Sequence, residues 1–461
     1  MLELNKFKHI FCIGIGGIGL SALAEIFLSR GCKVSGSDMK ASEITENLEQ
    51  KGAVVYFSHD SNQIKGADLL IYSSAVSMDN PELKAAISAG IPTLTRAEAL
   101  GLLMKEYKNS IAISGTHGKT TTTSMVSLIL ENAGVDPTIL VGGHLEEIGG
   151  NVKIGKSSYF VTEACEYMDS FLNLSPTIEI ILNIDSDHLD YFKDIEHIAN
   201  SFTRFAKLVP KDGYVIAYSS NPFVSRLLGS LTCNIITFGF DDQCDYYAAN
   251  IEFNAFGMPS FDLFHRESLL CSIQLSIPGE HNISNAVAAF ACCHNLGISP
   301  ENISMTLNSF NGTQRRFDVI GKTKKNVNVV DDYAHHPTEI MATLKAARNI
   351  PHNKLWCIFQ PHTYTRTIAL FDDFVSSFEN ADIIIFAEIY AAREKNIYKI
   401  SSKELASKTK EEYPAKEVFY FDDFQDISDF VKAKAQENDL VITMGAGDIY
   451  KVSELIVKES I

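Results

Sequence analysis

Short, continuous apolar runs rich in valine and isoleucine are the feature of this chain that most restricts its fold. Runs such as "IEIILNI", "ADIIIFAEI" and "KLWCIFQ" alternate with longer stretches in which apolar residues recur at helical spacing. A strand that is apolar on both faces must be covered on both faces, which is the situation of a parallel sheet between helices. The sequence therefore predicts an α/β protein built on parallel sheets.

Three sections of the chain begin in a similar way, and the first of them opens with a strand, a glycine turn and a helix. The 461 residues exceed the range of one ordinary core, so several domains are expected. We predict a Rossmann-like domain over residues 1–107, a central P-loop-type domain with a mostly parallel sheet over 108–318, and a C-terminal Rossmann-like α/β domain over 319–461. In the central domain, "DYYAANIEFNAFGMPSFDLFHRESLLCSIQLSIPG" is expected to add antiparallel strands.

Charge and cysteine content exclude some classes of protein. The net charge of -17 argues against nucleic acid or an anionic membrane as the main partner. Nine cysteines without a CxxC pair suggest neither a disulfide framework nor a zinc ribbon. No segment reaches the roughly 18 apolar residues of a membrane span. We expect a soluble cytoplasmic protein, with the oligomeric state open between monomer and homodimer.

The first glycine turn, "GIGGIG", follows a predicted strand and precedes the helical stretch "LSALAEIFLSRG". Gly14, Gly16 and Gly19 allow the backbone to approach a pyrophosphate at the helix start, and Asp38 follows at the distance where an acidic group meets a ribose hydroxyl. The alternatives are a dinucleotide such as NAD and a tight turn without a ligand. The turn indicates a pyrophosphate but does not identify the nucleotide.

The second loop, "SGTHGKTTTTSM", also joins an apolar strand to a helix. It departs from a strict Walker A pattern, because Ile113 stands where the first glycine is required. Its backbone amides from Thr116 onward can still surround phosphate oxygens, Lys119 can neutralise their charge, and the Thr120 hydroxyl can hold Mg²⁺. A simple helix cap needs one hydroxyl and no lysine. ATP with Mg²⁺ is the predicted ligand.

Two further residues are candidates for the same metal ion. Glu166 in "TEACEYMDSF" and His188 in "NIDSDHLDYF" each come just after a predicted strand of the central domain. Ligands collect at the carboxyl ends of strands in such sheets. Taken singly, a glutamate is more often a solvated surface charge and a histidine a turn or cap residue. Their matching placement in the domain that carries Lys119 favours the metal.

The C-terminal section places polar residues after two predicted strands, in "DDYAHHPTE" and "FQPHTYTRT". The two loops are expected to meet in one cleft at the strand ends. They supply Asp332, Tyr333, His335, His336, His362 and Arg366. The histidine pair is a weak zinc signal because no further ligand follows at a typical spacing. Arg315 and Arg316 in "GTQRRFD" are either a hinge ion pair or phosphate ligands.

These motifs together resemble the Mur ligase family, and the resemblance covers essentially the whole chain. It is carried, in order, by "GIGGIG", "SGSD", "SSAV", "GTHGKTTTT", "NIDSDHLDYF", "PGEHNISNA", "RRFD", "DDYAHHPTE", "FQPHTYTRT" and "GAGD". The histidine in "GTHGKT" is typical of members that add L-alanine to UDP-N-acetylmuramate and of a muropeptide-recycling relative. The recycling relative usually lacks "GIGGIG" and is the alternative.

The resemblance implies an ATP-dependent ligase of peptidoglycan precursor synthesis that joins L-alanine to the lactyl carboxylate of UDP-N-acetylmuramate. The reaction would pass through an acyl phosphate and release ADP and phosphate. The first domain would bind the UDP-sugar through Gly14, Gly16, Gly17, Gly19, Asp38 and Ser74. ATP would contact Gly115, Thr116, His117, Gly118, Lys119, Thr120, Thr121, His281, Asn282, Asn285, Arg316 and Asp332.

The resemblance also assigns the remaining roles. Mg²⁺ would be held by Thr120, Glu166 and His188, and L-alanine by Tyr333, His335, His362 and Arg366. The catalytic group would consist of Lys119, Glu166, His188, Arg316 and Arg366. The base that takes the proton of the amine is open between His335, His362 and a phosphate oxygen.

The chain departs from the family pattern at a few positions. Cys165 stands where an aspartate is usual, Thr363 where many members have arginine, and Asp185 and Ser186 where glutamate and proline are common. The loss of the arginine at 363 would make the alanine pocket depend more heavily on Arg366. Two competing classes are an NAD-linked oxidoreductase built on "GIGGIG" and a nucleotide-binding switch without catalysis.

Overall fold

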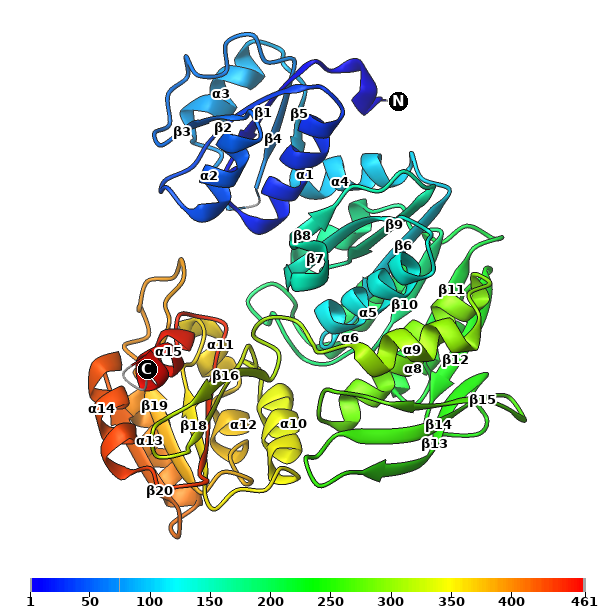
Figure 1. Cartoon of the computed structure of the whole chain (residues 1–461). Helices are drawn as coiled ribbons and strands as arrows, with labels where there is room; N and C mark the ends of the chain where they lie inside the picture. Colours follow the sequence, from blue (N-terminus) through cyan, green and yellow to red (C-terminus); the bar gives the residue numbers. More distant parts are fainter. Residues whose placement is uncertain (1, 74, 459–461) are drawn as a thin grey trace. The chain divides into compact units, whose positions relative to one another are not determined.

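The computed structural model of the chain describes residues 2–73 and 75–458 (Figure 1). The chain divides into two compact units, and each is described by itself. The first unit comprises Met1–Gly115, Thr122–Asn183 and Ala199–Ile236. The second comprises Thr116–Thr121, Ile184–Ile198 and Thr237–Ile461. Two short segments from the middle of the sequence thus belong with the C-terminal half.

The first unit opens with a parallel sheet of strand order β3-β2-β1-β4-β5. Its strands are β1 His9–Ile13, β2 Lys33–Ser37, β3 Val54–Tyr56, β4 Leu69–Tyr72 and β5 Thr93–Thr95. Its helices are η1 Leu4–Lys6, α1 Ile18–Ser29, α2 Glu43–Gln50, α3 Pro81–Ser88 and α4 Arg96–Met104. Helix α1 begins directly after Gly17, so "GIGGIG" is the strand-to-helix turn that the sequence predicts.

The same unit contains the strands β11-β10-β6-β9-β7-β8 in that order. Pairing is parallel among β11, β10, β6, β9 and β7 and antiparallel between β7 and β8. These strands are β6 Asn109–Ser114, β7 Thr138–Leu145, β8 Gly150–Lys153, β9 Tyr159–Glu163, β10 Ile178–Ile181 and β11 Tyr214–Tyr218. The helices are α5 Lys119–Asn132, which begins in the second unit, η2 Glu146–Ile148, η3 Tyr167–Asn173, α6 Ile195–Ala206 and α7 Pro222–Leu228.

The boundary between the units falls after Ile236, within β12 (Asn234–Gly239), and the strands that follow belong to the second unit. β12 pairs in parallel with β13, and β13, β14 and β15 form an antiparallel meander. These strands are β13 Tyr246–Phe253, β14 Pro259–His265 and β15 Ser268–Gln274, followed by α8 Glu280–Asn295 and α9 Pro300–Ser309. The antiparallel additions predicted for this stretch are confirmed.

The C-terminal part of the second unit is a six-stranded sheet of order β16-β17-β21-β18-β19-β20. Only β16 runs antiparallel to its neighbour among these strands. The strands are β16 Asp318–Lys322, β17 Asn328–Asp332, β18 Leu355–Phe359, β19 Ile383–Ala387, β20 Glu417–Phe421 and β21 Leu440–Met444. The helices are α10 Pro337–Arg348, α11 Tyr364–Ala369, α12 Phe371–Ser376, α13 Ser402–Glu412, α14 Phe424–Lys434 and α15 Tyr450–Lys458.

Helices cover both faces of this sheet, as its continuous apolar strands require. In β18, Cys357 and Phe359 pack on one face against residues of α10, α12 and α13. Trp356 and Ile358 pack on the other face against α14 and α15 (Figure 1). Alternate residues of β18 therefore pack into two apolar layers, one on each face of the sheet. These layers fix the strands whose ends carry the polar loops.

The α/β class and the three-sheet organisation are confirmed, whereas the exact domain boundaries stay a prediction. Each apolar run quoted above contains a strand of the structure. All nine cysteines lie in the described residues, and no disulfide joins any of them. In the part of the chain that the structure describes, no helix combines the length and the apolar character needed to cross a bilayer.

Candidate active site

The threonine-rich loop has the backbone that a phosphate-binding turn requires. β6 ends at Ser114 and α5 begins at Lys119, and the glycines between them, Gly115 and Gly118, have φ of 141° and 84°. Side chains rarely tolerate such values, so glycine is needed at both positions. The Lys119 ammonium donates to the carbonyl of Thr116 at 3.1 Å, which folds the lysine back across the loop. Amide groups at a helix start favour an anion at this point.

His117 joins this loop to two other segments of the second unit. Its Nε2 lies 3.2 Å from Asp185 Oδ2, and its Nδ1 lies 3.0 Å from Glu339 Oε1. Both partners only accept hydrogen bonds, so both ring nitrogens donate and the ring is an imidazolium. Burial alone would lower the pKa of His117, but the bonds to Asp185 and Glu339 and their charges outweigh it and raise the pKa from 6.5 to about 9. The side chain is 15% exposed.

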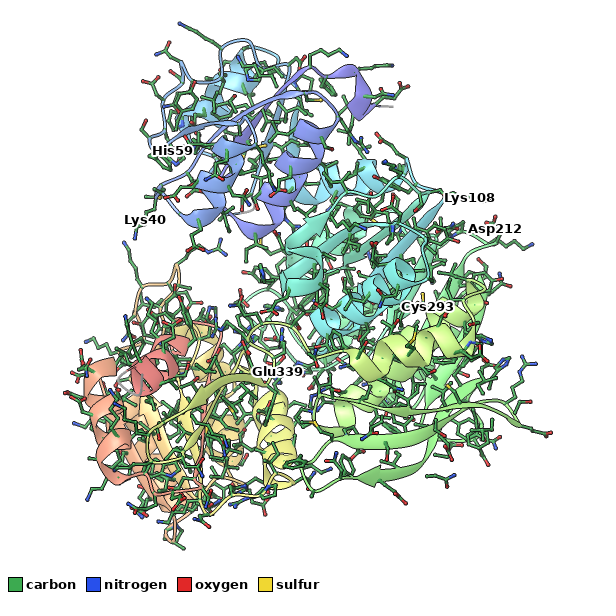
Figure 2. The ribbon with its side chains drawn as sticks, in the orientation of Figure 1. Lys40, His59, Lys108, Asp212, Cys293 and Glu339 are labelled. Carbon is green, nitrogen blue, oxygen red and sulfur yellow. The ribbon has the colours of Figure 1, made fainter. Side chains whose placement is uncertain are left out.

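Glu339 is one residue of this site that the sequence analysis missed. It occupies the third position of helix α10 (Figure 2), where its Oε2 accepts from the backbone N–H groups of His335 at 3.0 Å and His336 at 3.3 Å. Burial would raise the pKa of Glu339, but His335, His117 and Arg316 together lower it well below its usual value. The local signal was present, because a glutamate three residues after a helix cap is typical of a capping box. Its partner His117 is 222 positions away, which no local pattern indicates.

His336 was predicted as part of a histidine pair, and the structure places it beside His117 and Asp185. The ligand atoms of these three side chains lie within 4.8 Å of one another. His336 Nε2 contacts the carbonyl of Ser186 at 2.8 Å, and its Nδ1 accepts from the backbone N–H of Thr338 at 3.3 Å. Each ring nitrogen of both histidines therefore has a partner already. The group joins three segments by hydrogen bonds, and we assign no metal to it.

Arg366 lies in a second cluster of the same unit, together with Asp187 and His362. Arg366 Nε donates to Asp187 Oδ1 at 3.1 Å and Nη2 donates to Oδ2 at 3.4 Å. Arg366 Nη1 donates to His362 Nδ1 at 3.2 Å. The two charged side chains are 11% and 7% exposed. Burial would raise the pKa of Asp187, but Arg366 and three nearby histidines hold it well below its usual range.

His335 and His362 differ in which ring nitrogen carries the proton. An arginine only donates, so His362 Nδ1 is a lone pair and its proton sits on Nε2. His335 Nδ1 faces two acceptors, the carbonyl of Tyr333 at 2.9 Å and Glu339 Oε2 at 3.3 Å, so its proton sits on Nδ1 and Nε2 is the lone pair. Burial lowers the pKa of His335 to about 3 and, with help from Arg366, the pKa of His362 to about 4. Both rings are neutral at pH 7.

The neighbouring arginines of the hinge have different surroundings. Arg315 donates from all three of its side-chain nitrogens, to Asp331 Oδ2 and to the carbonyls of Gly447 and Gly445, at 2.9, 3.1 and 2.7 Å. Arg316 lies over the Tyr333 ring, 5.1 Å from its centre. Of the two open interpretations, the hinge ion pair describes Arg315. The contact of Arg316 with a phosphate stays a prediction.

Several predicted ATP-binding residues occupy buried positions in this unit. Both carboxylate oxygens of Asp332 accept backbone N–H bonds, from Phe317 at 2.8 Å and Ala334 at 2.7 Å, and burial raises the pKa of Asp332 to about 6. Asn282 Nδ2 donates to the carbonyl of Pro278, and Asn285 Nδ2 donates to Asn282 Oδ1. Burial lowers the pKa of His281 to about 4. Their contact with a nucleotide stays a prediction.

The predicted UDP-sugar residues lie in the first unit, except that Ser74 falls outside the described residues. The N–H of Gly14 donates to the carbonyl of Ser37 at 2.8 Å, and the N–H of Gly16 donates to Asp38 Oδ2 at 2.9 Å. A Cβ on Gly16 would lie 2.9 Å from Asp38 Oδ2, and one on Gly19 would lie 3.0 Å from an Arg96 nitrogen. The loop is therefore packed closely enough to require its glycines.

The three predicted magnesium ligands are divided between the units. Glu166 is 2% exposed and belongs to the first unit, at the start of η3. Thr120 and His188 belong to the second unit, and His188 has a φ of 53°. A hydroxyl, a carboxylate and an imidazole form a donor set that accepts a divalent cation with part of its water retained. Their convergence on one ion stays a prediction.

Comparison with known proteins shows which family these features belong to. Three family models match in sequence order: the Mur ligase family catalytic domain over residues 9–108, the Mur ligase middle domain over 113–293, and the Mur ligase glutamate ligase domain over 315–447. The UDP-N-acetylmuramate--L-alanine ligase of Acetivibrio thermocellus is 51% identical, over 100% of this chain and 97% of its own length. The chain belongs to the Mur ligase family. The resemblance of the motifs is therefore confirmed along the whole sequence.

Solved structures of Mur ligases share the same three-domain fold. The UDP-N-acetylmuramate-alanine ligase of Thermotoga maritima aligns with a TM-score of 0.82 at 28% identity, covering 98% of this chain and 99% of its own. A murein peptide ligase from Psychrobacter arcticus aligns with a TM-score of 0.73 at 25% identity, covering 97% and 98%. Both of the activities considered for the Mur ligase motifs are thus represented among the structural relatives.

Proposed function

We propose that this Mur ligase joins L-alanine to the lactyl carboxylate of UDP-N-acetylmuramate, with ATP converted to ADP and phosphate. The observation that carries the proposal is the 51% identity, along the full chain, to a ligase named for this reaction. The second unit supports the proposal with two features. One is a loop of the phosphate-binding type, and the other is the cluster around Arg366, whose guanidinium suits an amino-acid carboxylate. Nine cysteines without a disulfide fit a reducing compartment, and we place the reaction in the cytoplasm.

The first chemical task is to bring two anions together. A carboxylate is a poor electrophile, so its oxygen attacks the γ-phosphorus of ATP and the product is an acyl phosphate with a good leaving group. Lys119 and Arg316 offset the repulsion between the carboxylate and the triphosphate and stabilise charge on the group in transfer. His117 adds no net positive charge beside the loop, because its imidazolium is paired with Asp185 and Glu339. Each of these groups is already oriented by contacts within the second unit.

Mg²⁺ fits the donor set of Thr120, Glu166 and His188, although imidazole is the least typical of the three for this ion. When bound, it would neutralise charge on the triphosphate. The oxygen donors are the reason for preferring magnesium over a softer cation. The other predicted nucleotide contacts, from Gly115 through Thr121 and from His281, Asn282, Asn285 and Asp332, belong to the same proposal.

The second chemical task is attack by the neutral amine of L-alanine on the acyl phosphate. Arg366 would take the alanine carboxylate, and Tyr333, His335 and His362 would line the pocket. His335 is the histidine with an open lone pair on Nε2, so it accepts a hydrogen bond from the amine, whereas His362 donates from Nε2. With a pKa of about 3, His335 is protonated in only about one molecule in 10⁴ at pH 7. The proton therefore passes on to the departing phosphate, and His335 orients the amine.

The experiment that tests the proposal is ADP release with UDP-N-acetylmuramate and single amino acids. L-alanine should give the highest kcat/KM, and omission of either substrate should stop ADP formation. Lys119→Ala should abolish ADP release while UDP-N-acetylmuramate binding remains measurable by calorimetry, and the exposed Lys207→Ala serves as the matched control. ADP release that requires a tripeptide in place of L-alanine would establish the recycling activity instead. Reduction of NAD without ADP release would refute the ligase assignment.

A further inference from the structure

We propose that Asp187 is a positioning residue that orients Arg366 for the carboxylate of the incoming amino acid. The inference rests on the proposed function, in which Arg366 meets that carboxylate. Neither the sequence patterns nor the family resemblance assigned a role to Asp187. Its place in the structure is specific, because it contacts Arg366 from a different loop, 179 positions earlier in the chain.

The contacts of Arg366 show which of its N–H groups Asp187 does not occupy. A guanidinium has five N–H groups arranged along two edges. Asp187 takes the edge formed by Nε and Nη2, with contacts of 3.1 and 3.4 Å, and His362 Nδ1 takes one N–H of Nη1 at 3.2 Å. Among the described contacts, one N–H on Nη1 and one on Nη2 are not used, and they form the end-on fork if His362 accepts from the Nη1 hydrogen on the Cδ side. A planar carboxylate binds such a fork with two parallel hydrogen bonds.

The backbone just before α11, the helix that carries Arg366, has an unusual conformation. Thr363, just before helix α11, has a φ of 65°, which a β-branched residue adopts only when its surroundings impose it. Its N–H donates to the carbonyl of Tyr390 at 2.9 Å, and its own carbonyl accepts from Thr367 Oγ1 at 2.6 Å. These bonds fix the position of the Arg366 backbone. The contact with Asp187 fixes the orientation of its guanidinium.

The pairing of Asp187 with Arg366 matters because both side chains are buried. The Asp187 and Arg366 side chains are 7% and 11% exposed, so little water is available to solvate either charge alone. Removing the aspartate charge leaves a guanidinium with an unsatisfied edge, which then rotates toward other acceptors. A carboxylate at 187 therefore selects one orientation of the fork. The opposite possibility is that Asp187 occupies Arg366 and has to be displaced by the substrate, and the two possibilities predict opposite changes in KM.

The test is steady-state kinetics of the full-length Asp187→Asn variant with ATP, Mg²⁺ and UDP-N-acetylmuramate. An amide keeps the shape but offers its NH₂ group to a guanidinium that only donates. We expect KM for L-alanine to rise by about tenfold or more, with kcat and the KM values of ATP and UDP-N-acetylmuramate changed by less than about twofold. Selectivity for L-alanine over L-alaninamide should fall, because alaninamide lacks the carboxylate. A merely structural defect would slow both amines equally.

The chain offers a control in Asp382, which also pairs with one arginine by two contacts, from Arg348 Nη1 at 3.0 Å and Nη2 at 2.6 Å, at the other end of the sheet. Asp382→Asn should leave KM for L-alanine unchanged. Asp187→Glu keeps the charge and serves if the asparagine variant folds poorly; it should retain more of the selectivity for L-alanine over L-alaninamide. The double variant Asp187→Asn with Arg366→Lys should be no worse than Arg366→Lys alone, since both changes act on one group.

The outcomes separate this inference from the proposed function. An unchanged or lower KM for L-alanine in Asp187→Asn overturns the positioning role. A shift in the Mg²⁺ concentration needed for half-maximal rate also overturns it, because Asp187 would then act through the neighbouring His188. If Arg366→Lys leaves KM for L-alanine unchanged, the assignment of Arg366 in the proposed function fails. If Arg366→Lys raises KM and Asp187→Asn does not, the inference alone fails.

Discussion

Replacing His117 by glutamine should remove a stabilising contribution that depends on pH. In the wild type, the ring is doubly protonated between Asp185 and Glu339, at 3.2 and 3.0 Å. Glutamine has one donor group and one acceptor group and cannot satisfy two carboxylates. The variant should therefore be less stable than the wild type at pH 6.5, and the difference should shrink as pH rises.

The size of the effect comes from the pKa. The pKa of His117 rises from 6.5 in the unfolded chain to about 9 in the folded protein, which corresponds to a ceiling of about 3 kcal/mol of unfolding free energy. A histidine with a raised pKa stabilises fully below the unfolded value and loses that contribution as pH passes through the folded value. The loss should thus occur between about pH 6.5 and 9. The pKa values of Asp185 and Glu339 are both lowered, so these carboxylates stay ionised throughout that range.

The chain has a suitable probe for this measurement. Its single tryptophan, Trp356, is 2% exposed in β18 of the sheet against which α10 packs. Urea unfolding followed by Trp356 fluorescence at several pH values gives the free energy for wild type, His117→Gln and the control His352→Gln. A wild-type-to-variant difference that stays constant from pH 6.5 to 9 would show that His117 is not an imidazolium, and the reasoning from two acceptor partners would be wrong.

Three other variants test charged or acidic residues. Arg315→Met should lower the unfolding free energy by about 3 kcal/mol, because Asp331, 1% exposed, loses its ion pair; Arg316→Met should cost much less stability but suppress ADP release. Urea unfolding with Trp356 fluorescence compares the pair, and equal losses would contradict the division of roles. Burial raises the pKa of Glu179 to about 8, so this acid makes folding less favourable as pH rises from about 4.5 to 8. Glu179→Gln should slow hydrogen exchange in β10 at pH 8 relative to wild type, and faster exchange would refute this.

The sequence predicted the framework of this protein well because the framework follows from local patterns. The run "NVNVVDD" contains β17, and Pro337 opens helix α10, as a proline at a first helical position should. The antiparallel stretch after β12 was predicted from turns and alternation alone. In each case the determining residues are neighbours in the sequence.

The partners within the site could not be predicted in the same way. Asp187 meets Arg366 and Glu339 meets His117 only because the chain folds three distant segments together, and no spacing along the sequence encodes those pairs. The pair Arg315 and Arg316 illustrates the same limit. Two adjacent identical residues have equal local context, and only the tertiary structure shows that the first is fully bonded to β17 and the glycine turn after β21.

The second unit is made of three separate segments of the sequence, and this determines how the enzyme can be divided into fragments. A polypeptide cut near residue 318 would contain the "GTHGKT" loop and the "DSDH" segment but neither Glu339 nor Arg366. His117 would keep Asp185 but lose Glu339, and Asp187 would lose Arg366. A central fragment produced alone should show a disturbed nucleotide loop, and adding the C-terminal fragment in trans should restore it. Complementation of split halves, more than isolated domains, is the natural way to dissect this chain.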